Sequence, residues 1–105
     1  MQRYARSPGS RLYAVEVSGW DSRQSFFVEN CDLLWNEDTG KQVALRRTLR
    51  KNTTVFVRLL QNGEASRSRP VVYDAELIGK TERGVPQFRL SAAVPRHKEA
   101  GSSVA

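Results

Sequence analysis

Hydrophobic and polar residues alternate with a period of two along most of this sequence. Because successive side chains of a β-strand point to opposite faces, each alternating segment predicts a short strand with one buried face. The apolar members of these segments are Tyr13, Val15 and Val17; Val43 and Leu45; Val55, Val57 and Leu59; Val71, Tyr73, Ala75 and Leu77; and Phe88 and Leu90.

The run SFFVENCDLLW, residues 25–35, is longer and has apolar residues in both phases of the alternation. Phe27 and Leu33 belong to one face, whereas Phe26 and Val28 belong to the other. We therefore expect a strand that is covered on both sides or is bent by a β-bulge.

Gly, Asn, Asp and Ser residues separate these segments and predict turns at 19–22, 36–40, 61–64 and 79–84. Residues 41–51 (KQVALRRTLRK) have good helix propensity, but their apolar positions fit a helix only loosely. We interpret them as a strand followed by a loop. Six short strands with polar turns indicate an all-β domain, either a small antiparallel barrel or a sandwich.

The chain of 105 residues is long enough for one domain with a single core. We expect residues 1–10 to form a flexible basic arm, 11–94 the β-domain and 95–105 a disordered tail, because both ends lack apolar periodicity. No apolar run approaches the ~20 residues that span a bilayer, and none follows the N-terminal arginines. These features predict a cytoplasmic protein without a membrane span.

The net charge of +6 favours phosphate-bearing partners such as nucleotides, nucleic acid or an anionic membrane surface, although such a charge also serves solubility. The chain has one cysteine, Cys31, and one histidine, His97, which lies in the predicted tail. A disulfide, a Cys/His metal site and a nucleophile–base pair all need more such residues. We expect Cys31 to be a small core or half-buried residue, and the protein to have no catalytic residues, metal or cofactor.

Four segments follow one another in a distinctive order: LYAVEVSGWDS, SFFVENCDLLW, a turn ending in Gly40, and VALRRTLRKNTTVFVRLL. This order resembles that of PilZ domains, and RSRPVVYDAELIGKTERGVPQFRLSA resembles the closing hairpin of that family. The resemblance covers residues 11–92 and lies in pattern rather than identity. It implies a small six-stranded antiparallel β-barrel that serves bacterial signalling, since many PilZ domains are receptors for cyclic di-GMP.

The resemblance also implies where cyclic di-GMP would bind. PilZ domains that bind it have arginines spaced R-x-x-x-R on an arm before the first strand; here the arm offers Arg3, Arg6 and Arg11, with a different spacing. Guanidinium groups bind phosphates through paired hydrogen bonds and stack on guanine. The second motif, D/N-x-S-x-x-G between strands two and three, keeps Gly40, and Asn36 fills its first position after a one-residue slip.

Carboxylates replace the serine of that second motif, which falls on Glu37 or, with the slip, on Asp38. At ~4 Å and an effective dielectric constant near 20, a carboxylate and a phosphate repel each other by about 4 kcal/mol. Two interpretations stay open: a weakened cyclic di-GMP site, or an adaptor that acts through contacts with a protein partner.

Arg46, Arg47, Arg50 and Lys51 form the densest basic cluster of the chain. This cluster either docks nucleic acid or an acidic protein, or is a solvated loop at the rim of the barrel. It contains no aromatic residue on which a base would stack.

The alternative from another class is a small basic β-barrel of the OB or Sm-like kind that binds nucleic acid. The positive charge supports it, and the lack of aromatic residues interleaved with basic ones weakens it. Trp20 and Trp35 lie beside predicted turns, where we expect them to pack in the core or at its rim, or to offer a surface platform.

Overall fold

The computed structural model describes residues 10–61, 64–65 and 69–93, and these residues form strands and turns. The strands are β1 (Arg11–Trp20), β2 (Phe26–Asn36), β3 (Gly40–Ala44), β4 (Thr53–Gln61), β5 (Glu64–Ala65), β6 (Val71–Lys80) and β7 (Pro86–Ala92). The predicted tail, the predicted turn at Asn62–Gly63 and all of the predicted arm except Ser10 lie outside the described residues.

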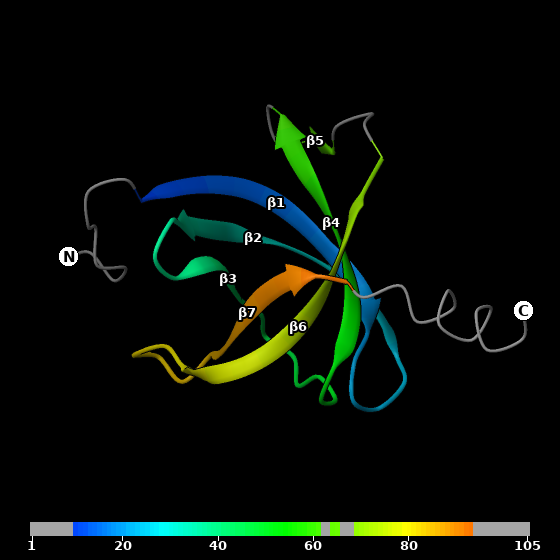
Figure 1. The fold of residues 1–105 in the computed structure, drawn as a ribbon. Coiled ribbons are helices and arrows are strands. Elements are labelled where there is room, and N and C mark those ends of the chain that lie inside the picture. Colours follow the sequence, from blue (N-terminus) through cyan, green and yellow to red (C-terminus); the bar gives the residue numbers. More distant parts are fainter. Residues whose placement is uncertain (1–9, 62–63, 66–68, 94–105) are drawn as a thin grey trace, which may run out of the picture.

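Six of the strands form a closed antiparallel barrel (Figure 1). Their order around the barrel is β1-β2-β3-β7-β6-β4, and the barrel closes because β1 pairs with β4 as well as with β2. Among the described residues, the short strand β5 pairs with the end of β4 alone. The predicted all-β barrel is therefore confirmed. No part of the described chain forms a helix that is long and apolar enough to cross a membrane.

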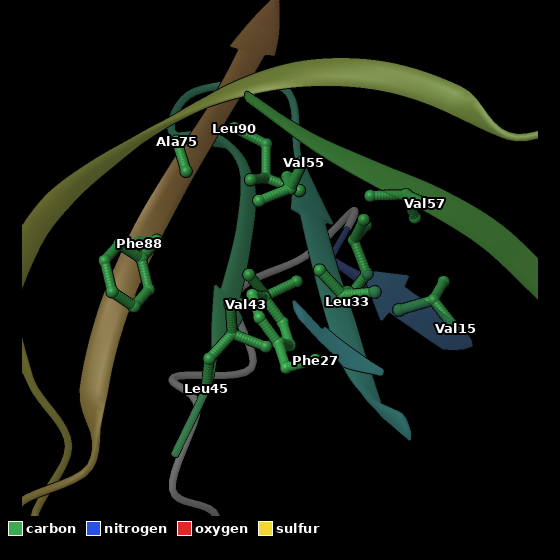
Figure 2. Packing of buried hydrophobic residues seen from close by; sticks show 11 residues of the cluster. Val15, Phe27, Leu33, Val43, Leu45, Val55, Val57, Ala75, Phe88 and Leu90 are labelled. Atoms are coloured by element: carbon green, nitrogen blue, oxygen red, sulfur yellow. The ribbon is translucent and has the colours of Figure 1, made fainter. Parts of the chain in front are cut away.

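The core consists of the alternate residues that point into the barrel, and Figure 2 shows 11 residues of this cluster, ten of them labelled, converging from the surrounding strands. Val17, Leu45 and Val55 have no exposed surface, and Phe88 is the largest of the fully buried side chains. Removing a side chain of this size from water contributes about 1.5–3 kcal/mol, so the alternation seen in the sequence is the main source of stability.

Strand β1 extends beyond its predicted end, because Gly19 and Trp20 belong to the strand and the turn covers residues 21–25. Gly19 is buried between its partners Phe27 of β2 and Val55 of β4. A Cβ atom at position 19 would lie 3.2 Å from the carbonyl oxygen of Thr54. The turn predicted at 19–22 is therefore displaced toward the C-terminus, because Gly19 allows the close approach of two strands rather than a change of direction.

The expectation that β2 is bent by a bulge or covered on both faces was wrong for most of the strand. Its register with β1 is unbroken, and Phe26 and Val28 are each more than half exposed. Only near its end, at Leu34, is the outer face buried. Trp20 is also half exposed, and its ring contacts Phe26 edge-on with centroids 5.0 Å apart.

Residues 45–52 cover the end of the barrel at which β1 meets β2. Leu45 is fully buried, and its backbone N–H donates to Pro86 O at 3.0 Å. Leu49 packs against the core, and Thr48 O accepts from Ser22 N at 2.8 Å. The prediction of a strand followed by a loop at 41–51 is confirmed, and the loop shields this end of the core.

The predicted turn at 79–84 is displaced toward the C-terminus. Strand β6 continues to Lys80, and a bulge between Leu77 and Gly79 shifts its register with β7. The turn itself is held by Thr81, whose backbone N–H donates to Val85 O at 2.9 Å and whose O accepts from Gly84 N at 2.9 Å. Gly84 has a φ of 82°, as a hairpin turn requires.

Candidate functional site

The end of the barrel opposite the 45–52 loop opens into a hollow, which we call the mouth. In the antiparallel barrel this end gathers the starts of β1, β3 and β6 and the ends of β2, β4 and β7. The hollow has a volume of about 460 Å³, within the range of small-molecule sites. Its walls carry the aromatic residues Tyr13, Trp35 and Tyr73 and the cations Arg11, Lys41 and Arg69.

The mouth continues the pattern of the core. Val15, Leu33 and Val57 line its base and are themselves core residues. The mouth residues two positions further along the same strands, such as Tyr13 and Trp35, point the same way. Aliphatic side chains and two phenylalanines, Phe27 and Phe88, fill the core, whereas larger polar aromatic and basic side chains occupy the corresponding positions at the mouth.

Trp35 lies between two cations because its strand is central to this part of the sheet. Arg11 of β1 and Lys41 of β3 are its register partners on either side. The guanidinium carbon of Arg11 lies 5.9 Å from the centre of the Trp35 ring. Lys41 Nζ lies 5.7 Å from the centre of the Tyr73 ring. Cations at these distances are attracted to the ring face without being neutralised, so the mouth is positively charged.

The segment 36–40 is the turn that the sequence predicts, and it borders the mouth. Asn36 pairs with Gly40, whose φ of 78° is in the left-handed region that glycine adopts most readily. The Oδ1 atom of Asn36 accepts from Asp38 N at 2.7 Å, and its Nδ2 atom donates to Ser10 Oγ at 2.8 Å. Asn36 is 7% exposed, so it orders the turn rather than facing a ligand.

The predicted ligand residues are therefore placed as follows. Arg11 lies in the mouth, Asn36 and Gly40 form the adjacent turn, and Arg3 and Arg6 lie outside the described residues. The hydrogen bond between Ser10 and Asn36 brings the root of the arm to the 36–40 turn. Glu37 and Asp38 of that turn are exposed.

The predicted basic cluster lies at the other end of the barrel and does not act as one surface. Arg47 lies 3.6 Å from Glu29 and 3.9 Å from Asp21, and its guanidinium is 5.1 Å from the centre of the Phe27 ring. These contacts fasten the 45–52 loop to β2. The other members of the cluster, Arg46, Arg50 and Lys51, are exposed.

The structure raises the pKa values of two side chains, Cys31 and Tyr73. Burial, followed by the negative charges of Glu29 and Asp32, raises the pKa of Cys31 to about 12, so its thiol is protonated at neutral pH. Cys31 is half-buried, as the sequence predicts. Burial also raises the pKa of Tyr73, which keeps its phenol as a hydrogen-bond donor in the mouth. Among the described residues, no group of His, Cys, Asp and Glu is arranged to hold a metal ion.

Sequence reasoning missed Tyr13, Trp35, Lys41, Arg69 and Tyr73 as a group. The signal was present, because Tyr13 follows the phase of Val15, and Lys41 that of Val43. Extending the inward phase of each strand to its end would have found the aromatic and basic residues at the mouth. The expectation that aromatic residues are not interleaved with basic ones holds for the 46–51 cluster but is wrong for the mouth.

A scan against protein-family models, a search of curated proteins and a search of solved structures found no match to this chain.

Proposed function

We propose that this chain is a non-catalytic, PilZ-like regulatory module of the bacterial cytoplasm that binds an anionic ligand with flat heterocyclic groups at the mouth. Cyclic di-GMP is the first candidate, because it combines two phosphates with two guanines. The observation that carries this proposal is the alternation of Arg11, Trp35, Lys41 and Tyr73 across the mouth. Cations there attract phosphate, and the rings offer faces on which bases stack.

Two further features support a PilZ-like arrangement. PilZ domains are six-stranded β-barrels, and this chain closes six strands. In the family the arm before the first strand and the loop between the second and third strands face one ligand. Here Ser10, at the root of the arm, is bonded to Asn36 in the corresponding loop, and Arg11 follows directly.

The turn contributes less to this site than the family motif implies. Asn36 already uses its side chain within the protein, and Glu37 and Asp38 carry negative charge. The aromatic rings and cations of the mouth therefore supply most of the binding energy. Folding of the arm onto the bound ligand would be the regulatory signal, with Arg3 and Arg6 adding phosphate contacts.

Calorimetric titration with cyclic di-GMP tests this proposal. We expect saturable binding that Arg11→Ala and Arg6→Ala each weaken by about tenfold or more, since a charge-assisted contact is worth about 1.5–3 kcal/mol. Lys51→Ala is the matched control: it removes the same charge from the opposite end of the barrel and should leave the affinity unchanged. Absence of binding at high micromolar ligand would contradict the ligand and favour an adaptor that acts through a protein partner.

A second candidate is binding of single-stranded nucleic acid. The same alternation of cations and rings suits bases and phosphates, and the net charge is +6. Titration with an oligonucleotide of arbitrary sequence distinguishes the two functions. Affinity that falls steeply with salt and is insensitive to sequence would favour nucleic acid, whereas saturable binding of cyclic di-GMP alone favours the first proposal.

A further inference from the structure

Strand β2 is paired on both sides over only part of its length. β1 pairs with β2 from Phe26 to Trp35, whereas the ladder between β2 and β3 begins only at Leu33. β3 ends at Ala44, and the chain then turns into the 45–52 loop. Within the described part of the chain, the first half of β2 therefore has no strand paired to it on the side away from β1.

The hydrogen-bond pattern of the β1–β2 hairpin identifies the residues of this edge. Asp21 N donates to Ser25 O at 2.9 Å, so residues 21 and 25 are a bonded pair. In an antiparallel ladder bonded and non-bonded pairs alternate, which turns Phe27, Glu29 and Cys31 toward β1. The backbone groups of Val28, Asn30 and Asp32 consequently point the other way. Because Leu33 pairs with Val43, the carbonyl of Asp32 faces the end of β3, whereas no strand in the described part of the chain pairs with Val28 and Asn30 on that side.

A groove of about 860 Å³ runs along this edge. Asn30 and Asp32 of β2 lie along one side, and Lys80, Arg83 and Val85 of the β6–β7 hairpin lie on the other. The carboxylate of Glu29 accepts a hydrogen bond from Arg46 N at 3.0 Å and lies 3.6 Å from the guanidinium of Arg47. The charges of Glu29 and Arg47 therefore compensate each other within the groove.

The remaining charges of the groove are unequal. Arg46, Lys80 and Arg83 are exposed cations, and Asp32 and Glu82 are exposed carboxylates. Two of the three cations are on the hairpin, across the groove from this edge of β2. A ligand whose side chains face the hairpin across the groove is therefore bound more favourably when those side chains are acidic.

We propose that this groove binds an extended acidic peptide segment of a partner protein, which adds to β2 as a strand. Val28 and Asn30 present donors and acceptors, and Asp32 a donor, at the two-residue spacing of a strand edge. The backbone of an extended chain matches that spacing. The mouth lies at the opposite end of the barrel, so this surface is independent of the ligand proposed above. It would give a PilZ-like module a place to contact its partner.

The test uses the ¹⁵N-labelled chain and two synthetic peptides, Thr-Glu-Val-Glu-Val-Glu-Thr and the same sequence with Lys in place of Glu. We expect the acidic peptide to slow hydrogen exchange at the amides of Val28, Asn30 and Asp32. The amides of Phe27, Glu29 and Cys31 are the internal control, because they are already bonded to β1. The double variant Lys80→Glu, Arg83→Glu should weaken the acidic peptide by about tenfold and favour the Lys peptide.

A third peptide avoids any change to the protein. N-methylation of alternate residues of the acidic peptide removes the backbone donors that face β2, and this peptide should not slow exchange at the three amides. Equal binding of the methylated peptide, or no slowed exchange at millimolar acidic peptide, would overturn the proposal. Protection of the three amides in the free chain that disappears on dilution would also overturn it, since a second copy would then occupy the edge.

Discussion

Lys41 of β3 reaches toward β6, where its Nζ atom lies 5.7 Å from the centre of the Tyr73 ring. Strand β7 lies between β3 and β6 in the sheet, so this contact spans a neighbouring strand. Arg11 contacts the ring of its direct partner on the adjacent strand, Trp35, at 5.9 Å. Neither cation forms an ion pair with a carboxylate in the described part of the chain. An incoming anion therefore meets charges that are oriented by rings and need not displace a carboxylate.

Trp35 is expected to supply a stacking surface for a base. Trp35→Ala should weaken the binding of cyclic di-GMP by about tenfold or more, because stacking of a base on an aromatic side chain is worth about 1–3 kcal/mol. Calorimetry measures this change, and thermal unfolding confirms that the variant folds. Trp20→Ala is the control, since Trp20 lies half exposed at the other end of the barrel. Equal effects of the two substitutions would show that the mouth is not the site.

Phe88 and Leu77 test the division between core and surface, because they are register partners with opposite exposure. Phe88 is 1% exposed and Leu77 is 60% exposed. Phe88→Ala should lower the free energy of unfolding by about 3–5 kcal/mol through lost burial and the cavity left behind. Leu77→Ala should change it by less than about 0.5 kcal/mol. Urea denaturation measures both, and a large loss for Leu77→Ala would mean that the β6–β7 hairpin packs on the barrel.

Asp21 is expected to make stability depend on pH. Its carboxylate accepts from the backbone N–H groups of Ser25 and Arg23 at 3.0 and 2.9 Å and lies near Arg47. The hydrogen bond from Ser25 is the main cause that lowers its pKa below the usual 3.8. A lowered pKa in the folded state stabilises the protein above the unfolded pKa, and this stabilisation is lost as the pH falls through the folded value.

Asp21→Asn should therefore be less stable than the parent chain at pH 7, and the difference should shrink below about pH 4. Urea denaturation across this range measures the effect. Asp38→Asn is the matched control, because no hydrogen bond or ion pair joins the carboxylate of Asp38 to another described residue. A difference for Asp21→Asn that stays constant with pH would contradict the role of its charge.

The thiol of Cys31 is expected to react slowly in the folded protein. Its pKa of about 12, against 9.0 for an unperturbed group, lowers the thiolate fraction at pH 8 by about a thousandfold. Alkylation with iodoacetamide, followed by mass spectrometry, should be slower in the folded chain than in urea by about tenfold or more, since the greater nucleophilicity of a high-pKa thiolate offsets part of the loss. Rapid alkylation of the folded chain would mean that the groove beside β2 opens widely.

The alternation of apolar residues was enough to predict the strands, since the core is built from one phase of each. Two strand ends were not predicted because glycine has more than one use. The sequence predicts turns that begin at Gly19 and Gly79, yet both residues lie within strands, and Gly19 lets β1 pass close to β4. The exposure of Phe26 was also not predicted, because the sequence does not distinguish an apolar residue on a solvent-exposed face from one that is buried.

The candidate site could be predicted only in part. Arg11 and the 36–40 turn were found through the family resemblance, whereas Lys41 and Tyr73 meet only because β7 brings β3 and β6 near each other. Such a meeting depends on the order of strands in the closed barrel. The alternation along one strand does not contain that order.

The closing ladders of the barrel also set the order in which the chain can acquire its structure. Val15 pairs with Leu59 in the β1–β4 ladder, and Lys41 pairs with Leu90 in the β3–β7 ladder. Both ladders therefore join residues that are far apart in sequence. Contacts of such long range slow folding toward the millisecond-to-second range typical of small β-barrels. During synthesis on the ribosome, β3 and β6 keep unpaired edges until β7 has emerged. The growing chain thus carries these unpaired edges, which favour aggregation, until β7 is made.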